Sequence, residues 1–206
     1  MRRTTLALAT TALLLAPLSA SAKSRGFDST VAAPVQTPVS IEVVLSEDLA
    51  HRADNLPRDI AKRGGGIRSR SGFSGNGFYG QRDLDRLLEE VREELTEDFA
   101  KRGIAISEDA PTVLKVTLED VKNNRPTFEQ LSREPGLSFQ SFGIGGAELS
   151  AEVLGADGQS EGSLRYRWFE TFQDPGFLRA NGTWTDANRA ISRFSRHAAK
   201  ELSPTS

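Results

Sequence analysis

Residues that could act as a nucleophile, base or metal ligand are sparse in this sequence. The chain has two histidines, His51 and His197, and no cysteine. A hydrolytic triad needs a nucleophile on a strained turn and a histidine directed at it, and the sequence contains no G-x-S-x-G pattern. It also contains no H-E-x-x-H zinc motif and no Asp-rich calcium loop. We therefore name no catalytic residue, no metal ligand and no cofactor-binding residue.

A glycine motif comes nearest to a cofactor site. Gly75, Gly77 and Gly80 form G-x-G-x-x-G directly before a predicted helix. A dinucleotide loop needs a buried strand immediately upstream, but residues 67–71 read IRSRS, which is no strand. Residues 62–80 contain seven glycines, a composition typical of a mobile loop. The motif is interpreted as a chance match, and no cofactor is predicted.

The connection from Lys122 to Gly146 is the segment closest to a binding function. It is longer than most loops of a compact domain, and long ordered loops are often functional. Thr127 and Gln130 resemble a capping box for one short helical turn. Two interpretations remain open: its apolar residues cap the core, which is the commoner arrangement, or they stay exposed and bind a partner. The candidate partner surface has aromatic residues with arginines as a polar rim: Arg125, Phe128, Arg133, Phe139 and Phe142.

A β-hairpin is the element on which the rest of the fold is expected to pack. Apolar and polar residues alternate on both sides of an Asp-Gly turn between 147–154 and 164–169, which predicts two antiparallel strands. Pairings whose residue numbers have an odd sum place Ala151 opposite Tyr166 or Leu164. The same pairings bring glutamates of the first strand beside arginines of the second. Trp168 is expected on the apolar face, beneath the long helix described next.

Further elements follow from their periodicity. Residues 41–46 and 112–121 alternate as strands do, and residues 83–102 carry an apolar stripe at helical spacing, with Gly103 as the terminator. The acidic outer face of this helix is typical of a solvated surface rather than a metal site. A final helix begins at Thr185 or Asp186 and ends near residue 203. The predicted fold class is α+β, a mostly antiparallel β-sheet with two amphipathic helices packed on one face.

The first 22 residues have the pattern of a secretory signal peptide. Arg2 and Arg3 precede an apolar run over residues 6–18, and Ala20-Ser21-Ala22 has the form of a cleavage site. Cleavage is expected before Lys23. The apolar run is shorter than the ~20 residues that cross a bilayer, and without cysteine the chain has no site for lipidation after the signal. We expect a flexible lead-in over 23–40 and a single domain over 41–203 with a mobile glycine-rich loop at 62–80.

Composition limits the classes of partner. Removing residues 1–22 would change the formal charge from −2 to −4, because two arginines and no acidic residues are lost. A mildly acidic chain with no basic cluster argues against nucleic acid. An exported chain without cysteine has no disulfides, so the fold depends on burial alone.

The order strand, long helix, strand, hairpin, helix behind a signal peptide resembles the small α+β modules of the bacterial envelope. These include the amino-terminal domain of TolB and the outer-membrane lipoprotein activators of peptidoglycan synthases. The resemblance covers most of the mature chain at the level of element order, and it implies a noncatalytic module that binds other envelope proteins. The segment DVKNNRPTFEQL is the kind of block that marks an uncharacterised exported family.

These observations together predict an exported, noncatalytic bacterial envelope module, periplasmic or secreted, that binds a protein or another envelope component. No cofactor, no nucleic acid and no transmembrane segment in the mature chain are expected. The alternative is a periplasmic or secreted hydrolase with no linear catalytic signature, because carboxylates that meet only in the folded chain leave no motif. The identity of the partner and the oligomeric state stay open.

Overall fold

The structure is a computed structural model that describes residues 25–59, 76–171, 173–174 and 181–204. The predicted signal peptide and most of the predicted glycine-rich loop lie outside the described residues. Within the described part of the chain, no helix is both long and apolar enough to cross a membrane.

Five strands form one sheet in the order β1-β5-β4-β3-β2. Their bounds are Gly26–Ser29 for β1, Val39–Leu45 for β2, Thr112–Lys122 for β3, Gly146–Leu154 for β4 and Ser160–Phe169 for β5. All neighbouring pairs are antiparallel except β2 and β3, which are parallel. A parallel pair needs a crossover connection, and the segment that contains the long helix supplies it.

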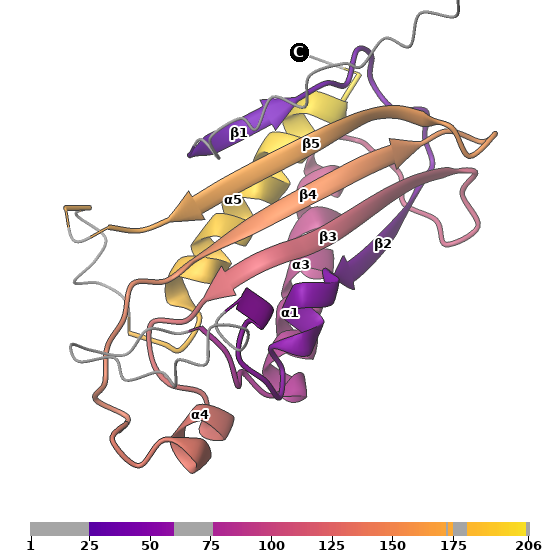
Figure 1. Ribbon diagram of the computed structural model, residues 1–206. Coiled ribbons are helices and arrows are strands. Elements are labelled where there is room, and N and C mark those ends of the chain that lie inside the picture. The colour runs from indigo at the N-terminus through magenta and orange to yellow at the C-terminus, as the bar shows by residue number, and fades with distance from the viewer. Residues whose placement is uncertain (1–24, 60–75, 172, 175–180, 205–206) are drawn as a thin grey trace, which may run out of the picture.

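Two long helices cover one face of this sheet, as Figure 1 shows. They are α3, Gln81–Lys101, and α5, Thr185–Leu202; the short helices are α1, Glu47–His51, and α4, Phe128–Arg133. α3 and α5 pack against each other, α3 also lies against β2, and α5 lies against β4 and β5. The core fills the space between helices and sheet. The predicted α+β class, with two amphipathic helices on one face, is confirmed.

The hairpin has the predicted register. Ala151 pairs with Leu164, and Glu148 pairs with Arg167. The helix-facing residues of both strands are buried, whereas the opposite face is charged. Glu148 is buried on that opposite face, where Arg167 Nε donates to its Oε2 at 3.1 Å and Arg165 Nη2 donates to its Oε1. Side-chain alternation and charge pairing therefore specify the same register.

Trp168 lies under a different helix from the one expected. It is half-buried and packs against the core, but the guanidinium of Arg193 on α5 lies 4.6 Å from its ring centroid and that of Arg25 lies 3.5 Å away. The prediction that it lies beneath the long helix is wrong, because β5 is on the α5 side of the sheet and α3 covers the β2 side.

The predicted flexible lead-in contains a strand, β1, which its sequence does not predict. β1 pairs antiparallel with β5, with Phe27 opposite Tyr166, and Phe27 stacks on His197 with 4.9 Å between ring centroids. Four residues are too few for a convincing alternation, and the strand exists because the edge of β5 offers unpaired backbone groups.

The end of the predicted mobile loop belongs to the core. Tyr79 is completely buried, and its hydroxyl donates a hydrogen bond to the carbonyl oxygen of Val121 at 2.7 Å. The prediction of a mobile loop over residues 62–80 is therefore wrong for Tyr79, because burial of one large aromatic side chain stabilises the end of the stretch.

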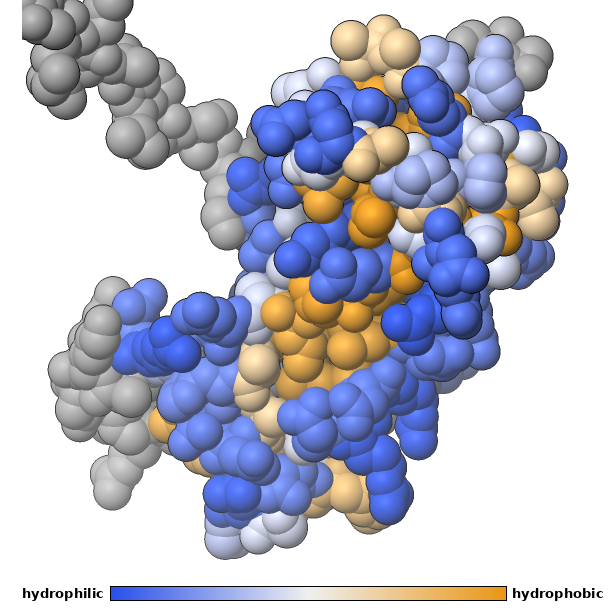
Figure 2. Space-filling view, turned by 90° about the vertical axis from the view of Figure 1, so that its right-hand side faces the viewer, coloured by the Kyte–Doolittle hydropathy of each residue, from blue (hydrophilic) through white to orange (hydrophobic). Residues whose placement is uncertain are grey.

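The other edge of the sheet is formed by β2. A groove of about 500 Å³ runs beside it, with Ile41, Val43 and Ile106 in its lining together with Arg92 of α3. Figure 2 looks at this side of the molecule and shows an apolar area framed by hydrophilic residues.

Candidate functional site

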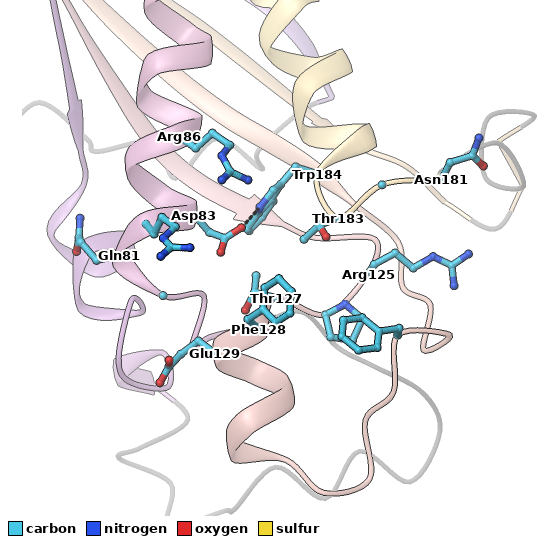
Figure 3. A pocket seen from close by; sticks show the side chains of 15 residues that line it. Gln81, Asp83, Arg86, Arg125, Thr127, Phe128, Glu129, Asn181, Thr183 and Trp184 are labelled. Atoms are coloured by element: carbon cyan, nitrogen blue, oxygen red, sulfur yellow. Dashed lines mark hydrogen bonds between the residues drawn. The ribbon is translucent and has the colours of Figure 1, made fainter.

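A cavity of about 630 Å³ lies where both long helices begin. Its wall comes from three parts of the chain: residues 80–86 at the start of α3, residues 125–129 with Phe139, and residues 181–184 before α5. Figure 3 shows these residues on different elements: Asp83 and Arg86 point toward Trp184, whereas Arg125 and Asn181 extend away from it. The volume is within the range of ~300–1,000 Å³ that is typical of ligand sites.

A buried amide holds the connection against α5. Asn124 is fully buried; its Oδ1 accepts from the backbone N–H of Asp186 at 2.9 Å, and its Nδ2 donates to Asp186 Oδ2 and to the carbonyl of Gly143. Asp186 Oδ2 also accepts from the backbone N–H of Gly145 at 3.3 Å. The network therefore joins the beginning and the end of the connection to the first turn of α5.

A second amide network places α4. Asn123 Nδ2 donates to Gln130 Oε1 at 2.6 Å, and Gln130 Nε2 donates to the carbonyl oxygen of Gly77 at 2.8 Å. The predicted capping box of Thr127 and Gln130 is present. Because these amides are buried and hydrogen-bonded, they fix α4 against the segment that precedes α3.

Two phenylalanines at the cavity are exposed to solvent. Phe128 is 77% exposed and Phe139 is 68% exposed, and their rings meet edge to face with 5.8 Å between centroids. A pair of exposed aromatics on a well-ordered support is typical of an interaction surface rather than of a core cap.

The cavity wall has an excess of positive charge. Arg82, Arg86 and Arg125 line it, and none of them has a carboxylate partner among the described residues. The carboxylates in the lining are already engaged: Asp83 Oδ1 accepts from Trp184 Nε1 at 2.9 Å, and Glu129 Oε1 accepts from Arg133 Nε at 2.5 Å.

Trp184, which lines the cavity, belongs to a buried aromatic pair. The buried Trp184 meets Tyr79 edge to face, with 5.4 Å between ring centroids. Burial raises the pKa of Tyr79 above its usual range, although Arg52 opposes this effect. Tyr79 therefore stays protonated and serves as a hydrogen-bond donor, not as a base.

The structure brings three residues of the predicted partner surface together at the cavity: Arg125, Phe128 and Phe139. Phe142 is not part of the lining; it is half-buried, with the Arg125 guanidinium 4.9 Å from its ring centroid. Arg133 does not line the cavity.

Arg133 instead pairs with Glu129 and with Asp54, at 3.9 Å from the latter, and its guanidinium covers the ring of Phe78. The predicted polar rim is therefore divided between two sides of α4.

Sequence reasoning missed Arg82, Arg86 and Trp184. The two arginines stand one turn apart in the first turns of α3. Like charges at this spacing repel each other, and cations near a helix N-terminus oppose the helix dipole. Because this placement disfavours the helix, it is the feature of the sequence that could have indicated another role for these arginines.

Within the described residues, no cluster of three or more histidine, cysteine, aspartate or glutamate side chains could hold a metal ion. Neither histidine lines the cavity; His51 ends α1, and His197 stacks on Phe27.

Comparisons with known proteins do not identify the chain. No family model and no curated protein matches it. Among solved structures, the PelC dodecamer from Paraburkholderia phytofirmans matches at 10% identity with a TM-score of 0.39, covering 82% of this chain and 96% of that chain.

A PelC variant dodecamer from the same organism, in another crystal form, matches at 10% identity with a TM-score of 0.42, covering 86% and 98%. Protein XCC0632 from Xanthomonas campestris, of the family DUF330, matches at 12% identity with a TM-score of 0.38, covering 82% and 89%. These matches do not show the predicted resemblance to the amino-terminal domain of TolB.

Proposed function

We propose that this protein is an exported, noncatalytic module of the bacterial cell envelope that binds a protein or another envelope component at the cavity. The observation that carries the proposal is the pair of exposed rings, Phe128 and Phe139, at the cavity that α3, α4 and α5 surround.

The surface is ready to bind without rearrangement. The buried amides of Asn123, Asn124 and Gln130 hold the chain on both sides of the phenylalanines. A partner would therefore lose little of its binding free energy to ordering the surface. Aromatic residues that are exposed in the free protein and become buried on association are the residues that most often dominate an interface.

The hydrolase alternative finds no such support at the cavity. Two carboxylates flanking a scissile bond are the usual requirement. Asp83 and Glu129 are the carboxylates of the lining, and each is engaged by a donor from the protein itself.

Crosslinking in intact cells tests the proposal. Phe128→Ala/Phe139→Ala is compared with Ile106→Ala, which removes the other large exposed apolar side chain of the described residues. We expect the thermal midpoint to be nearly unchanged in both variants and the crosslinked partner to be lost only from the double phenylalanine variant.

Two results would contradict this assignment. A fall of many degrees in the melting temperature of Phe128→Ala/Phe139→Ala would show that the rings cap the core. Loss of the crosslink from Ile106→Ala alone would place the partner at the groove beside β2.

A further inference from the structure

The cavity arginines differ from most arginines in the structure in their ion pairing. Most of the others pair with a carboxylate; Arg167, for example, reaches Glu148 at 3.1 Å, and Arg189 reaches Asp186 at 3.0 Å. Arg82, Arg86 and Arg125 have no such partner among the described residues. The lining holds these three arginines and two carboxylates, Asp83 and Glu129, so its formal charge is 3 − 2 = +1 in a chain of formal charge −2. The cavity is therefore a local site of complementary charge for an anion.

The arginines lie around the cavity rather than on one side of it. In Figure 3, Arg86 extends from α3 toward Trp184, and Arg125 lies across the cavity from Gln81. Arg125 is held in place, because its Nη1 donates to the carbonyl oxygen of Gln140 at 2.9 Å and its guanidinium stacks on Phe142. A guanidinium that is already oriented loses less conformational entropy when it binds a carboxylate.

The two exposed rings limit which kind of anion fits the cavity, because the ligand must also contact an apolar surface. A small inorganic ion would contact the arginines and leave Phe128 and Phe139 in water. A nucleic acid would place many phosphates near Asp83 and Glu129, which also line the cavity. A peptide with acidic residues on both sides of an apolar side chain can contact both the arginines and the two exposed rings.

We propose that the cavity binds an acidic peptide segment of the partner, with carboxylates on Arg82 and Arg86 and an apolar side chain against Phe128 and Phe139. Arg125 binds a further carboxylate at the opposite side. This inference rests on the proposed function and specifies the chemistry of the partner.

The test measures fluorescence anisotropy of a labelled peptide in which one phenylalanine is flanked on each side by two glutamates. Matched peptides replace every glutamate by glutamine, or the phenylalanine by serine. The protein is used as the full processed chain, as wild type, as Arg82→Glu/Arg86→Glu, and as the control Arg102→Glu/Arg196→Glu. The control reverses two exposed arginines that lie outside the cavity lining, so both variants change the net charge equally.

We expect saturable binding of the acidic peptide. The glutamine peptide and Arg82→Glu/Arg86→Glu should weaken it about tenfold or more, since charge-assisted hydrogen bonds are worth that much. The serine peptide should weaken it about tenfold or more as well, because it loses the burial of a large apolar side chain. The control variant should bind like wild type. No saturable binding, or equal weakening by both double variants, would overturn the proposal.

Competing anions complete the design. Sodium phosphate at matched ionic strength and phosphatidylglycerol vesicles should not displace the peptide beyond the effect of sodium chloride. Specific displacement by either would reassign the site to free phosphate or to lipid headgroups. If Phe128→Ala/Phe139→Ala loses its crosslink in cells while no acidic peptide binds, the proposed function stands and this inference fails. Peptide binding with unchanged crosslinking would support the acidic site and remove the proposed function.

Discussion

Asn124 joins three separate parts of the chain through one amide group. Its replacement by alanine leaves the backbone N–H of Asp186 without a partner in a buried place and removes the hydrogen bond to the half-buried carbonyl of Gly143. Each such group costs about 1–3 kcal/mol when it is left unsatisfied. We expect Asn124→Ala to lower the free energy of unfolding by at least ~2 kcal/mol in urea titrations.

Asn181→Ala is the matched control for this change, because Asn181 is exposed and near the same cavity. It should unfold at the wild-type urea midpoint. Equal midpoints for all three proteins would show that the amide network does not hold the connection in place.

Tyr79 should make the free energy of unfolding depend on pH in the alkaline range. Burial raises its pKa in the folded state, whereas an unfolded tyrosine titrates near ~10. Above that pH the unfolded state loses the proton and the folded state keeps it, so the stability that is present below pH ~10 is lost as the pH rises further. Tyr79→Phe should reduce this loss, as measured by the free energy of unfolding between pH 8 and 11; an unchanged slope contradicts the assignment.

Trp168 and Phe194 allow the cost of truncating a half-buried aromatic side chain to be compared with that of a fully buried one. Phe194 is fully buried, so Phe194→Ala should lower the free energy of unfolding by about 3–5 kcal/mol. Trp168 is half-buried between the guanidinium groups of Arg25 and Arg193, and Trp168→Ala should cost less. If urea titrations show a larger loss of unfolding free energy for Trp168→Ala than for Phe194→Ala, Trp168 is fully buried rather than half-buried.

At the scale of the element, α3 shows how binding and stability can oppose each other. Arg82 and Arg86 repel each other and lie at the positive end of the helix. The two introduced carboxylates would still repel each other, but an anion at position 82 suits the positive end of the helix. Arg82→Glu/Arg86→Glu should therefore raise the free energy of unfolding by roughly 0.3–1 kcal/mol, although it weakens the proposed peptide binding. Thermal unfolding at low salt decides the sign, and a destabilised variant would show that the arginines contribute to the fold.

The elements that the sequence predicts well are those with a long periodic pattern. The stripe of α3 spans many turns, and the hairpin has alternation and charge pairs that agree on one register. β1 has only four residues and depends on the edge of β5, so no local sequence pattern predicts it. Tyr79 shows the same limit, because its burial is decided by neighbours that are distant in sequence.

The candidate site is less predictable for a related reason. The aromatic residues of the connection are unusual within one segment, and the sequence therefore identifies Phe128 and Phe139. Arg82, Arg86 and Trp184 reach the cavity from two other segments, and only the packing of α3 against α5 brings them near. Arg133 is the opposite case, since it is adjacent in sequence but turned to the other side of α4.

At the scale of the whole molecule, the predicted signal peptide remains the decisive expectation. We expect protein from the extracytoplasmic fraction to begin at Lys23, because Ala20-Ser21-Ala22 has the small-x-small form of a cleavage site. Intact mass spectrometry measures the first residue directly. A chain that still begins at Met1 would remove the export part of the proposed function and leave the cavity unaffected.

The pairing of β1 with β5 joins segments of the chain that are far apart in sequence. Phe27 meets Tyr166, and the backbone N–H of Val35 reaches the carbonyl of Leu202. The beginning of the chain must therefore wait for its partners until nearly all of the protein has been synthesised. Such non-local closure makes folding slow. If the protein is exported as we propose, an edge strand that pairs late would leave the start of the mature chain unpaired during passage through a translocation channel.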